Sequence, residues 1–302
     1  MELGYIGLGK MGFNMVERLL EKGHSVVVFD KNEEAARNIS NRGAQAAVSL
    51  QAMIAVLNTP RLVWIMVPYQ AVDAVLLELI PLLQKGDTII DGGNSPYKES
   101  MRRAHELECK GIDFLDVGVS GGPAGARNGA CLMIGGSKNR FDRLEGLFRD
   151  ISADQGYGYM GKSGTGHFVK MVHNGIEYGM MQSIAEGFAV MKASNFDLNL
   201  VRIAGVYNRK SVIESRLVGW LKSAFEEHGE NLDDISGSVS QSGEGLWTVE
   251  AAKELGVPAP IIEGSFQFRV QSQERPSYTG QIVSALRNQF GGHEVSKKEG
   301  GK

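Results

Sequence analysis

A glycine pattern near the start of the chain restricts the possible folds more than any other feature of the sequence. The stretch YIGLGKMG places Gly7, Gly9 and Gly12 in a G-x-G-x-x-G spacing, between a β-rich run and a helical pattern. In such a turn the first glycine permits a tight bend, the second lets the backbone approach a pyrophosphate, and the third lets helix and strand pack closely. The pattern predicts a dinucleotide-binding unit, with Leu8 and Met11 also contacting the cofactor.

An acidic residue follows the second β-rich run. Asp30 comes directly after SVVVF and before Lys31. A carboxylate at this place accepts hydrogen bonds from a ribose 2′-hydroxyl and repels a 2′-phosphate, so Asp30 favours NAD over NADP. Lys31 opposes this preference without reversing it. The alternative is a glycine-rich turn that binds no ligand, followed by an ordinary polar turn residue.

Short β-rich runs alternate with helical stretches through the first half of the chain. This order predicts a doubly wound, Rossmann-type α/β domain with a parallel sheet, over residues 1–162. After the glycine-rich stretch 157–166 the patterns are mainly helical, which predicts an all-α domain over residues 163–302. The predicted strands begin near Leu3 and then cover 25–30, 61–68, 87–93, 112–122 and 130–136.

Composition excludes several classes of protein. The chain has 302 residues, enough for two domains, and a net charge of −3 that gives no overall attraction to nucleic acid or to an anionic membrane. It has no apolar run of about 18 residues, and its two cysteines and six histidines show no metal-binding spacing. We therefore expect no bound metal and no membrane span. The small number of cysteines, and a first strand that leaves no room for a signal peptide, predict a cytoplasmic protein.

The stretch GHFVKMVHNGIEYGMMQ reads as an apolar helix with one reactive side. At 100° per residue, Lys170, His173, Asn174, Glu177 and Tyr178 share that side. Few charged residues occur between 164 and 191, so the helix is predicted to be largely buried. Burial lowers the pKa of an amine and raises the pKa of a carboxylic acid, so both move toward pH 7, where proton transfer is efficient. Lys170 and Glu177 therefore form a plausible acid and base. The alternative is a polar stripe that serves hydrogen bonding or a subunit contact.

Several spaced blocks together carry a family resemblance. The blocks resemble 6-phosphogluconate dehydrogenase (decarboxylating) and occur in the same order as in that family. The chain length resembles that of the family's short, NAD-type form. The blocks cover the first ~195 residues closely and then the C-terminus, a match far more specific than the glycine pattern alone. They read GLGKMGFNM, DGGNSPYKES, DVGVSGGPAGARNGACLMIGG, GHFVKMVHNGIEYGMMQ and LRNQFGGH.

The resemblance implies a role for each matching residue. Lys170 would be the general base and acid, and Glu177 would assist the later protonation. The family's C-terminal arm would carry Arg287 and His293 to a neighbouring subunit's site, which implies a dimer or a tetramer. The remaining implied contacts are Asn94, Ser120, Gly121 and Gly122 on the substrate and nicotinamide side, His173 and Asn174 on the sugar acid, and Tyr178 and Arg269 on the phosphate.

The resemblance implies oxidative decarboxylation of 6-phosphogluconate to ribulose 5-phosphate and CO2, with NAD as oxidant. The chain departs from the long forms at SQSGEGLWT, where Ser242 replaces a lysine and Glu244 adds an acid, and at Met180, which replaces an aspartate. An acid beside a phosphate site is unfavourable unless cations outweigh it. Two alternatives remain: another NAD-dependent β-hydroxyacid dehydrogenase, of 3-hydroxyisobutyrate or tartronate semialdehyde type, and a non-catalytic NAD-binding sensor.

Overall fold

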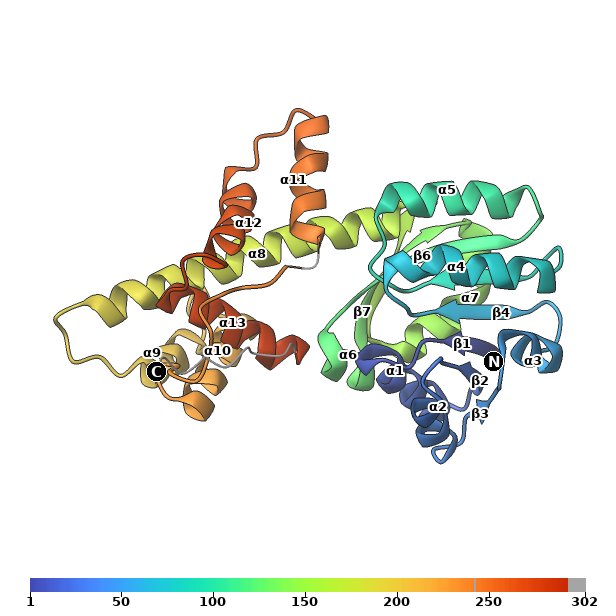
Figure 1. Cartoon of the computed structure of the whole chain (residues 1–302), viewed down its shortest axis with the longest axis horizontal. Helices are drawn as coiled ribbons and strands as arrows, with labels where there is room; N and C mark the ends of the chain where they lie inside the picture. The colour runs from blue at the N-terminus through green and yellow to red at the C-terminus, as the bar shows by residue number, and fades with distance from the viewer. Residues whose placement is uncertain (242, 293–302) are drawn as a thin grey trace. The chain divides into compact units, whose positions relative to one another are not determined.

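The computed structural model describes residues 1–241 and 243–292 and forms two compact units, Met1–Met171 and Val172–Lys302. In Figure 1 the first unit, blue to green, is a sheet with helices packed around it, and the second, yellow to red, is helical. The long helix α8 (Thr165–Ala193) belongs to both units. The boundary predicted after residue 162 follows the end of strand β8 at Gly161. The two compact units divide later, between Met171 and Val172, because the first turns of α8 pack onto the sheet.

The sheet of the first unit has eight strands in the order β3-β2-β1-β4-β5-β6-β7-β8. Neighbouring strands are parallel, except that β7 runs antiparallel to β6. The chain builds outward from β1 in one direction and then returns to build in the other, which is the doubly wound arrangement predicted. The strands are β1 (Glu2–Ile6), β2 (Ser25–Phe29), β3 (Gln45–Ala46), β4 (Leu62–Ile65), β5 (Thr88–Asp91), β6 (Asp113–Ser120), β7 (Ala130–Gly136) and β8 (Ser152–Gly161).

Apolar side chains cover both faces of this sheet. Because successive side chains of a strand point to opposite faces, Val26 and Val28 of β2 join one core cluster and Val27 joins the other. The fully buried Trp64 of β4 packs with the first cluster and its neighbour Ile65 with the second. A central sheet buried on both faces explains why the inner strands read as continuous apolar runs.

Helices cover each face of the sheet. Helices α1 and α7 pack on the face that carries Val26 and Val28, and helices α3 and α4 pack on the opposite face. Asn32 and Ser49 accept hydrogen bonds from the first turns of α2 and α3, so side-chain caps fix where these helices start. The helical elements are α1 (Lys10–Glu21), α2 (Glu33–Ser40), α3 (Leu50–Val56), α4 (Tyr69–Leu79), the short η1 (Ile80–Leu82), α5 (Tyr97–Glu108), α6 (Gly122–Asn128) and α7 (Lys138–Ile151).

Within the described residues 172–241 and 243–292, helices are the only regular secondary structure of the second unit, which confirms the predicted all-α domain. Its core joins the end of α8 to three other helices through Phe188, Phe225 and their apolar neighbours. Ser215 and Ser277 cap the starts of two of its helices with their side-chain oxygens. The helices that follow α8 are α9 (Leu200–Tyr207), α10 (Arg216–His228), α11 (Glu244–Glu254), α12 (Pro260–Ser272) and α13 (Tyr278–Gly291).

Three sequence-based expectations differ from the structure. Residues 157–161 of the glycine-rich stretch form the end of the last strand, β8, which is absent from the predicted strands. The antiparallel β7 was not anticipated, because an apolar run carries no sign of its direction. Helix α8 was predicted to be largely buried, yet Ile176, Met180 and Val190 are 53, 43 and 71 % exposed.

Candidate functional site

The glycine turn lies between β1 and α1, and each of its three glycines has a different environment. Gly7 has a φ of +98°, and a Cβ there would lie 2.3 Å from the Met66 carbonyl oxygen. A Cβ on Gly12 would lie 2.0 Å from the Gly7 oxygen, whereas one on Gly9 would meet nothing within 4 Å. Packing therefore requires the outer two glycines, and the middle one leaves open space beside the start of α1, as a bound pyrophosphate requires.

Asp30 is tied to this turn. One of its carboxylate oxygens accepts a hydrogen bond from the Leu8 backbone N–H at 2.6 Å, and the other accepts from the Asn32 N–H at 2.7 Å. The carboxylate is therefore fixed at the carboxyl end of β2, next to the turn, where it can accept a hydrogen bond from a ribose hydroxyl. Met11, also predicted to contact the cofactor, is partly buried against the core.

The loop that carries Asn94 rests on a buried polar network. Asp91, at the end of β5 and fully buried, accepts hydrogen bonds from the Gly93 N–H at 3.1 Å and the Ser95 hydroxyl at 2.7 Å. Arg103 of α5, 1 % exposed, donates to Ser95 at 3.1 Å and to Asp91 at 3.4 Å. These contacts hold the backbone on both sides of the exposed Asn94. Sequence reasoning missed the network, since an arginine in a polar helix looks like any surface residue.

Lys170 is positioned by contacts between α8 and β6. Asp116, fully buried on β6, accepts hydrogen bonds from the backbone N–H groups of Gly164 at 2.7 Å and His167 at 2.9 Å, at the start of α8. A Cβ on Gly118 would lie 2.3 Å from the Lys170 Cβ, so the lysine stem packs directly on the strand backbone. Lys170 is 7 % exposed. Asp116 was not predicted, because nothing in DVGVSGG separates a buried cap from a surface turn.

The turn after β6 brings three more predicted residues to the same edge of the sheet. Ser120 ends the strand, and Gly121 and Gly122 follow with φ values of +126° and +63°. Only glycine adopts such angles readily, so the backbone turns sharply into α6 and presents its polar groups at the carboxyl end of β6. Lys170 packs on Gly118, two residues before this turn.

The second unit gathers the predicted phosphate-binding residues. The Arg269 guanidinium of α12 lies 3.3 Å from the ring centroid of Tyr178 and contacts the Met181 sulfur at 3.6 Å. Arg287 of α13 donates to the Ser240 hydroxyl at 2.6 Å. The two arginines are 3 and 7 % exposed, and the Tyr178 hydroxyl is buried without a hydrogen-bond partner in the structure.

The electrostatics of these arginines are unusual. Burial lowers the pKa of Arg269 to about 10, helped by the charge of Arg287 and opposed by Tyr178, Glu177 and Glu244. Burial also lowers the pKa of Arg287, against the same three neighbours. Two desolvated cations close to the same tyrosine form a site that an anion would stabilise.

The predicted residues thus fall into two groups. The glycine turn, Asp30, Asn94, the Ser120 turn and Lys170 belong to the first unit, and the tyrosine and arginine cluster belongs to the second. His173 and Asn174 are joined by a 2.9 Å contact between Nδ1 and Oδ1, and Glu177 is half-buried. Ser242 and His293 lie outside the described residues.

Arg287 lies among groups of its own chain. Its electrostatic neighbours Tyr178 and Glu244 are in the same compact unit, and its hydrogen-bond partner Ser240 is as well. The expectation that a C-terminal arm carries this arginine to a neighbouring subunit's site gains no support from the single chain and stays a prediction.

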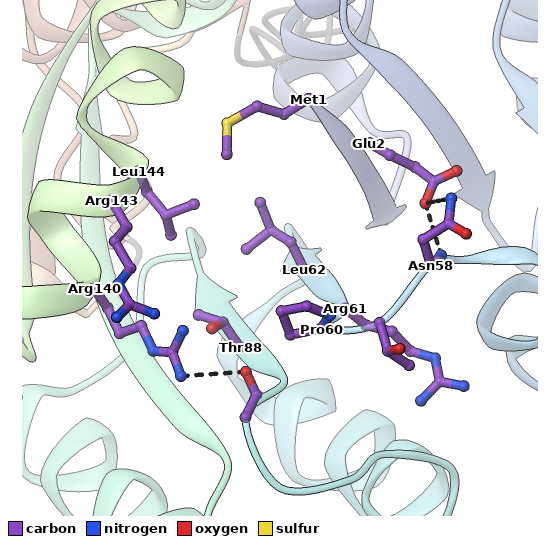
Figure 2. Close-up of a pocket in the computed structure, with 12 residues that line it drawn as sticks. Met1, Glu2, Asn58, Pro60, Arg61, Leu62, Thr88, Arg140, Arg143 and Leu144 are labelled. Carbon is purple, nitrogen blue, oxygen red and sulfur yellow. Dashed lines mark hydrogen bonds between the residues drawn. The ribbon is translucent and has the colours of Figure 1, made fainter.

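A pocket of about 400 Å³ lies elsewhere, at the amino ends of β1, β4 and β5 (Figure 2). None of the predicted site residues lines it. Two of its arginines are already paired, Arg61 with Asp87 at 3.3 Å and Arg140 with Asp113 at 2.6 Å. Ligands of doubly wound sheets bind at the opposite, carboxyl edge of the strands. This pocket is therefore not the candidate active site.

The residues that the structure describes, 1–241 and 243–292, show neither a metal site nor a membrane span. There, no three His, Cys, Asp or Glu residues lie together as a metal ion would need. No helix in that part has the length and hydropathy required to cross a bilayer.

A doubly wound unit with a glycine turn after β1, followed by an all-helical unit, defines the class of two-domain nicotinamide-dependent dehydrogenases. Residues 2–173 match the NAD-binding domain of 6-phosphogluconate dehydrogenase, and residues 166–289 match the C-terminal domain of that enzyme. The chain belongs to the 6-phosphogluconate dehydrogenase family. The resemblance and the NAD-binding domain predicted from the sequence are confirmed.

Two full-length relatives match nearly the whole chain. The NAD⁺-dependent, decarboxylating 6-phosphogluconate dehydrogenase of Haloferax volcanii is 42 % identical, over 99 % of this chain and 100 % of its own. YqeC of Bacillus subtilis, whose name provisionally assigns it as a 6-phosphogluconate dehydrogenase, is 47 % identical over 99 % of this chain and 100 % of its own. By contrast, the match to the Synechocystis enzyme covers 63 % of that protein. The chain thus matches the first two relatives over their full length and the third over part of its length.

Solved structures show the same architecture. Plasmodium falciparum 6-phosphogluconate dehydrogenase, studied with NADP⁺ and with 6-phosphogluconate, has a TM-score of 0.79 and 28 % identity, covering 95 % of this chain and 70 % of its own. Mycobacterium tuberculosis 3-hydroxyisobutyrate dehydrogenase has a TM-score of 0.75 at 18 % identity, covering 95 % and 99 %. The second likeness shows the shared fold alone.

Proposed function

We propose that this protein oxidises and decarboxylates 6-phosphogluconate, giving ribulose 5-phosphate and CO2, with NAD as the electron acceptor. Family membership supports the reaction, and the packing of Lys170 is the structural observation that carries it. The lysine stem packs against Gly118, two residues before Ser120, and this contact fixes the position from which the side chain extends to its amine. A proton-transfer group must be held in this way to act efficiently.

The residues of the first unit fit a bound dinucleotide. The open space at Gly9 would admit the pyrophosphate, and Asp30 would accept a hydrogen bond from the ribose. When bound, NAD supplies the acceptor for the hydride that leaves C3 of the substrate. The fixed carboxylate of Asp30 would repel the 2′-phosphate of NADP, and this supports the preference for NAD.

Lys170 performs the proton transfers in this proposal. As a neutral amine it accepts the proton of the C3 hydroxyl while C3 is oxidised to a ketone. The new carbonyl lies β to the C1 carboxylate, so loss of CO2 leaves an enolate oxygen at C3. The Lys170 ammonium stabilises that oxygen and returns the proton to it. Glu177 then donates a proton to the former C2, which becomes C1 of the ketose, while the neutral Lys170 amine takes the proton of the neighbouring enediol hydroxyl.

The other predicted residues hold the substrate. His173, Asn174, Asn94 and the Ser120 turn would contact the sugar acid. Tyr178, Arg269 and Arg287 would bind the phosphate, because two buried guanidinium groups and a buried hydroxyl without a partner suit an anion with several oxygens. The buried Asp91 and Arg103 keep the Asn94 loop in place without contacting the substrate.

We also propose that the protein forms a homo-oligomer, a dimer or a tetramer. Apolar side chains remain exposed on α8, at Ile176 and Met180, and on α12, at Ile261 and Val270. Such a surface is unfavourable in water unless a second copy covers it. The two cysteines, both unpaired and exposed, fit a reducing compartment, and we place the enzyme in the cytoplasm. Light scattering would test the oligomeric state.

The decisive experiment follows NADH and CO2 together in purified protein supplied with 6-phosphogluconate and NAD. We expect both products in equal amounts, and a loss of kcat of about 10² to 10⁴-fold in Lys170→Met, the range for a lost general acid and base. Lys192→Met is the matched control, because Lys192 is an exposed lysine of the same helix. NADH without CO2 would favour a β-hydroxyacid dehydrogenase, no turnover at all would favour a sensor, and an unchanged kcat in Lys170→Met would remove the assigned role.

A further inference from the structure

Helix α5 joins the two segments of the first unit that carry Asn94 and Lys170. It begins at Tyr97, directly after the Asn94 loop, and its first turn packs on the start of α8. A Cβ on Gly164 would lie 3.1 Å from the Tyr97 carbonyl oxygen, so the two segments approach closely there. The rings of Tyr97 and Phe168 also meet edge to face, with centroids 5.1 Å apart. A shift of α5 would therefore move the start of α8 with it.

A buried hydrogen bond joins the same two helices. The Ser100 hydroxyl of α5 lies 2.7 Å from Nδ1 of His167 on α8, and these residues are 0 and 1 % exposed. The His167 backbone N–H donates to the buried Asp116 of β6 at 2.9 Å. His167 is thus attached to β6 by its backbone and to α5 by its ring. It lies about one helical turn before Lys170.

The second ring nitrogen of His167 has no such contact. Its Nε2 is buried and has no hydrogen-bond partner among residues 1–241 and 243–292. A buried polar atom without a partner lowers stability, so an apolar side chain of similar size would fill this space at a lower cost. Stability alone therefore does not favour histidine here. What the histidine ring supplies is the bond from Nδ1 to Ser100.

We propose that His167 is a positioning residue, which through Nδ1 and Ser100 fixes Lys170 relative to the Asn94 loop. The inference rests on the proposed reaction, in which the C3 hydroxyl loses its proton to Lys170 while the hydride leaves C3. Both acceptors have to be in place at once, so a lysine that shifts relative to this loop slows the reaction more than it weakens binding. Arg103 of the same α5 holds the other side of the loop through Ser95.

Two replacements of His167 separate the roles of its ring nitrogens. In His167→Asn the side-chain amide places a polar atom close to the position of Nδ1, where it can still bond to Ser100. In His167→Gln the amide reaches the position of Nε2 instead, and a methylene group lies nearer to Ser100. Glutamine is the larger of the two and leaves the smaller cavity. A residue that only fills space would therefore tolerate glutamine better than asparagine.

The assay is steady-state NADH formation from 6-phosphogluconate by the full-length protein, with circular dichroism as the test of folding. We expect kcat to fall about tenfold in Ser100→Ala and His167→Gln and by less than about threefold in His167→Asn, a smaller loss than the roughly 10²-fold of a 1 Å displacement. The KM for NAD should stay close to that of the wild type, because the glycine turn and Asp30 are not altered.

Ser152→Ala is the matched control for the loss of a buried hydroxyl. Ser152 is 3 % exposed, begins the outer strand β8 and donates to the Arg149 carbonyl oxygen at 3.2 Å. It touches none of the proposed site residues in these contacts, so its loss should leave kcat unchanged. A fall in kcat as large as that of Ser100→Ala would show that any lost buried hydroxyl slows the enzyme, which would overturn the proposal.

The double variant tests whether Ser100 and His167 act through one bond. Ser100→Ala combined with His167→Gln should be no slower than the slower single variant, because a bond that is already broken cannot be lost again. Effects that multiply, or a kcat lower in His167→Asn than in His167→Gln, would contradict the positioning role.

Ser100→Ala removes only a hydroxyl, so it tests the proposal even if the histidine variants do not fold. A wild-type kcat in Ser100→Ala would overturn the positioning role and leave the proposed reaction valid. Absence of NADH formation by the wild type would instead contradict the proposed reaction itself.

Discussion

Gly118→Ala changes the proposed active site without touching a reactive group. The new Cβ would lie 2.3 Å from the Lys170 Cβ and 3.0 Å from the Gly166 carbonyl oxygen. Carbon atoms in contact are normally about 3.5–4 Å apart, so the lysine stem has to move by roughly 1 Å or more. A shift of about 1 Å in a catalytic group costs on the order of 10²-fold in rate. We therefore expect kcat to fall about 100-fold.

The assay is NADH formation at saturating substrate and NAD, together with circular dichroism and urea unfolding. Overpacking of this kind typically destabilises a protein by about 1–3 kcal/mol, so the variant should remain folded at 25 °C. Gly146→Ala is the control, because its Cβ would meet only the far end of the Arg149 side chain, at 3.8 Å. A folded Gly118→Ala protein with kcat within threefold of wild type would show that the lysine position is not critical.

Three further perturbations test other parts of the structure. Tyr178→Phe removes a buried hydroxyl without a hydrogen-bond partner, a group that costs about 1–3 kcal/mol of stability. Calorimetry of the protein without ligand should therefore show an equal or higher Tm, and a lower Tm would contradict this. The KM for 6-phosphogluconate should rise, because the proposed phosphate site loses a hydroxyl. Asp30→Asn should reduce the ratio of kcat/KM with NAD to that with NADP by about tenfold, equal to about 1.4 kcal/mol of discrimination, and an unchanged ratio would refute the role of its charge. Burial lowers the pKa of His24, despite its contact with Asp150. Its neutral form contributes stability above about pH 6.5, and this stability is lost as the pH falls through the lowered pKa. The free energy of unfolding in urea should therefore fall less between pH 7 and pH 5 in His24→Gln than in the wild type, and an equal fall would count against this.

The fold could be predicted largely because its signals are local. Apolar runs such as 61–68 and 87–93 need burial on both faces, and the glycine turn allows little else than a strand followed by a helix. The same reasoning could not find β3, which has two residues, or β8, whose glycines resemble a linker. Both are edge strands, where pairing with one neighbour rather than an apolar pattern decides the structure.

The candidate site was predicted where reactive residues stand at helical spacing, as at Lys170 and Tyr178. What holds them in place was not, because the supporting contacts join distant segments. Asp116 receives N–H groups from the start of α8, and Arg103 reaches back to Asp91. The presence of Arg287 beside Tyr178 of the same chain likewise depends on how four helices pack, and a single sequence does not reveal this.

The boundary between the two compact units has a consequence for the evolution of substrate recognition in this family. Lys170 is held by β6 and lies before the division at Met171, whereas the arginine and tyrosine cluster lies wholly after it. In the proposed reaction, the general base Lys170 and the residues that would bind the substrate's phosphate are therefore encoded in separate stretches of sequence, and the second proton donor, Glu177, lies in the stretch with the phosphate-binding residues. An exchange of the second stretch that retains Glu177 would change the residues proposed to bind the phosphate and leave Lys170 packed on its strand.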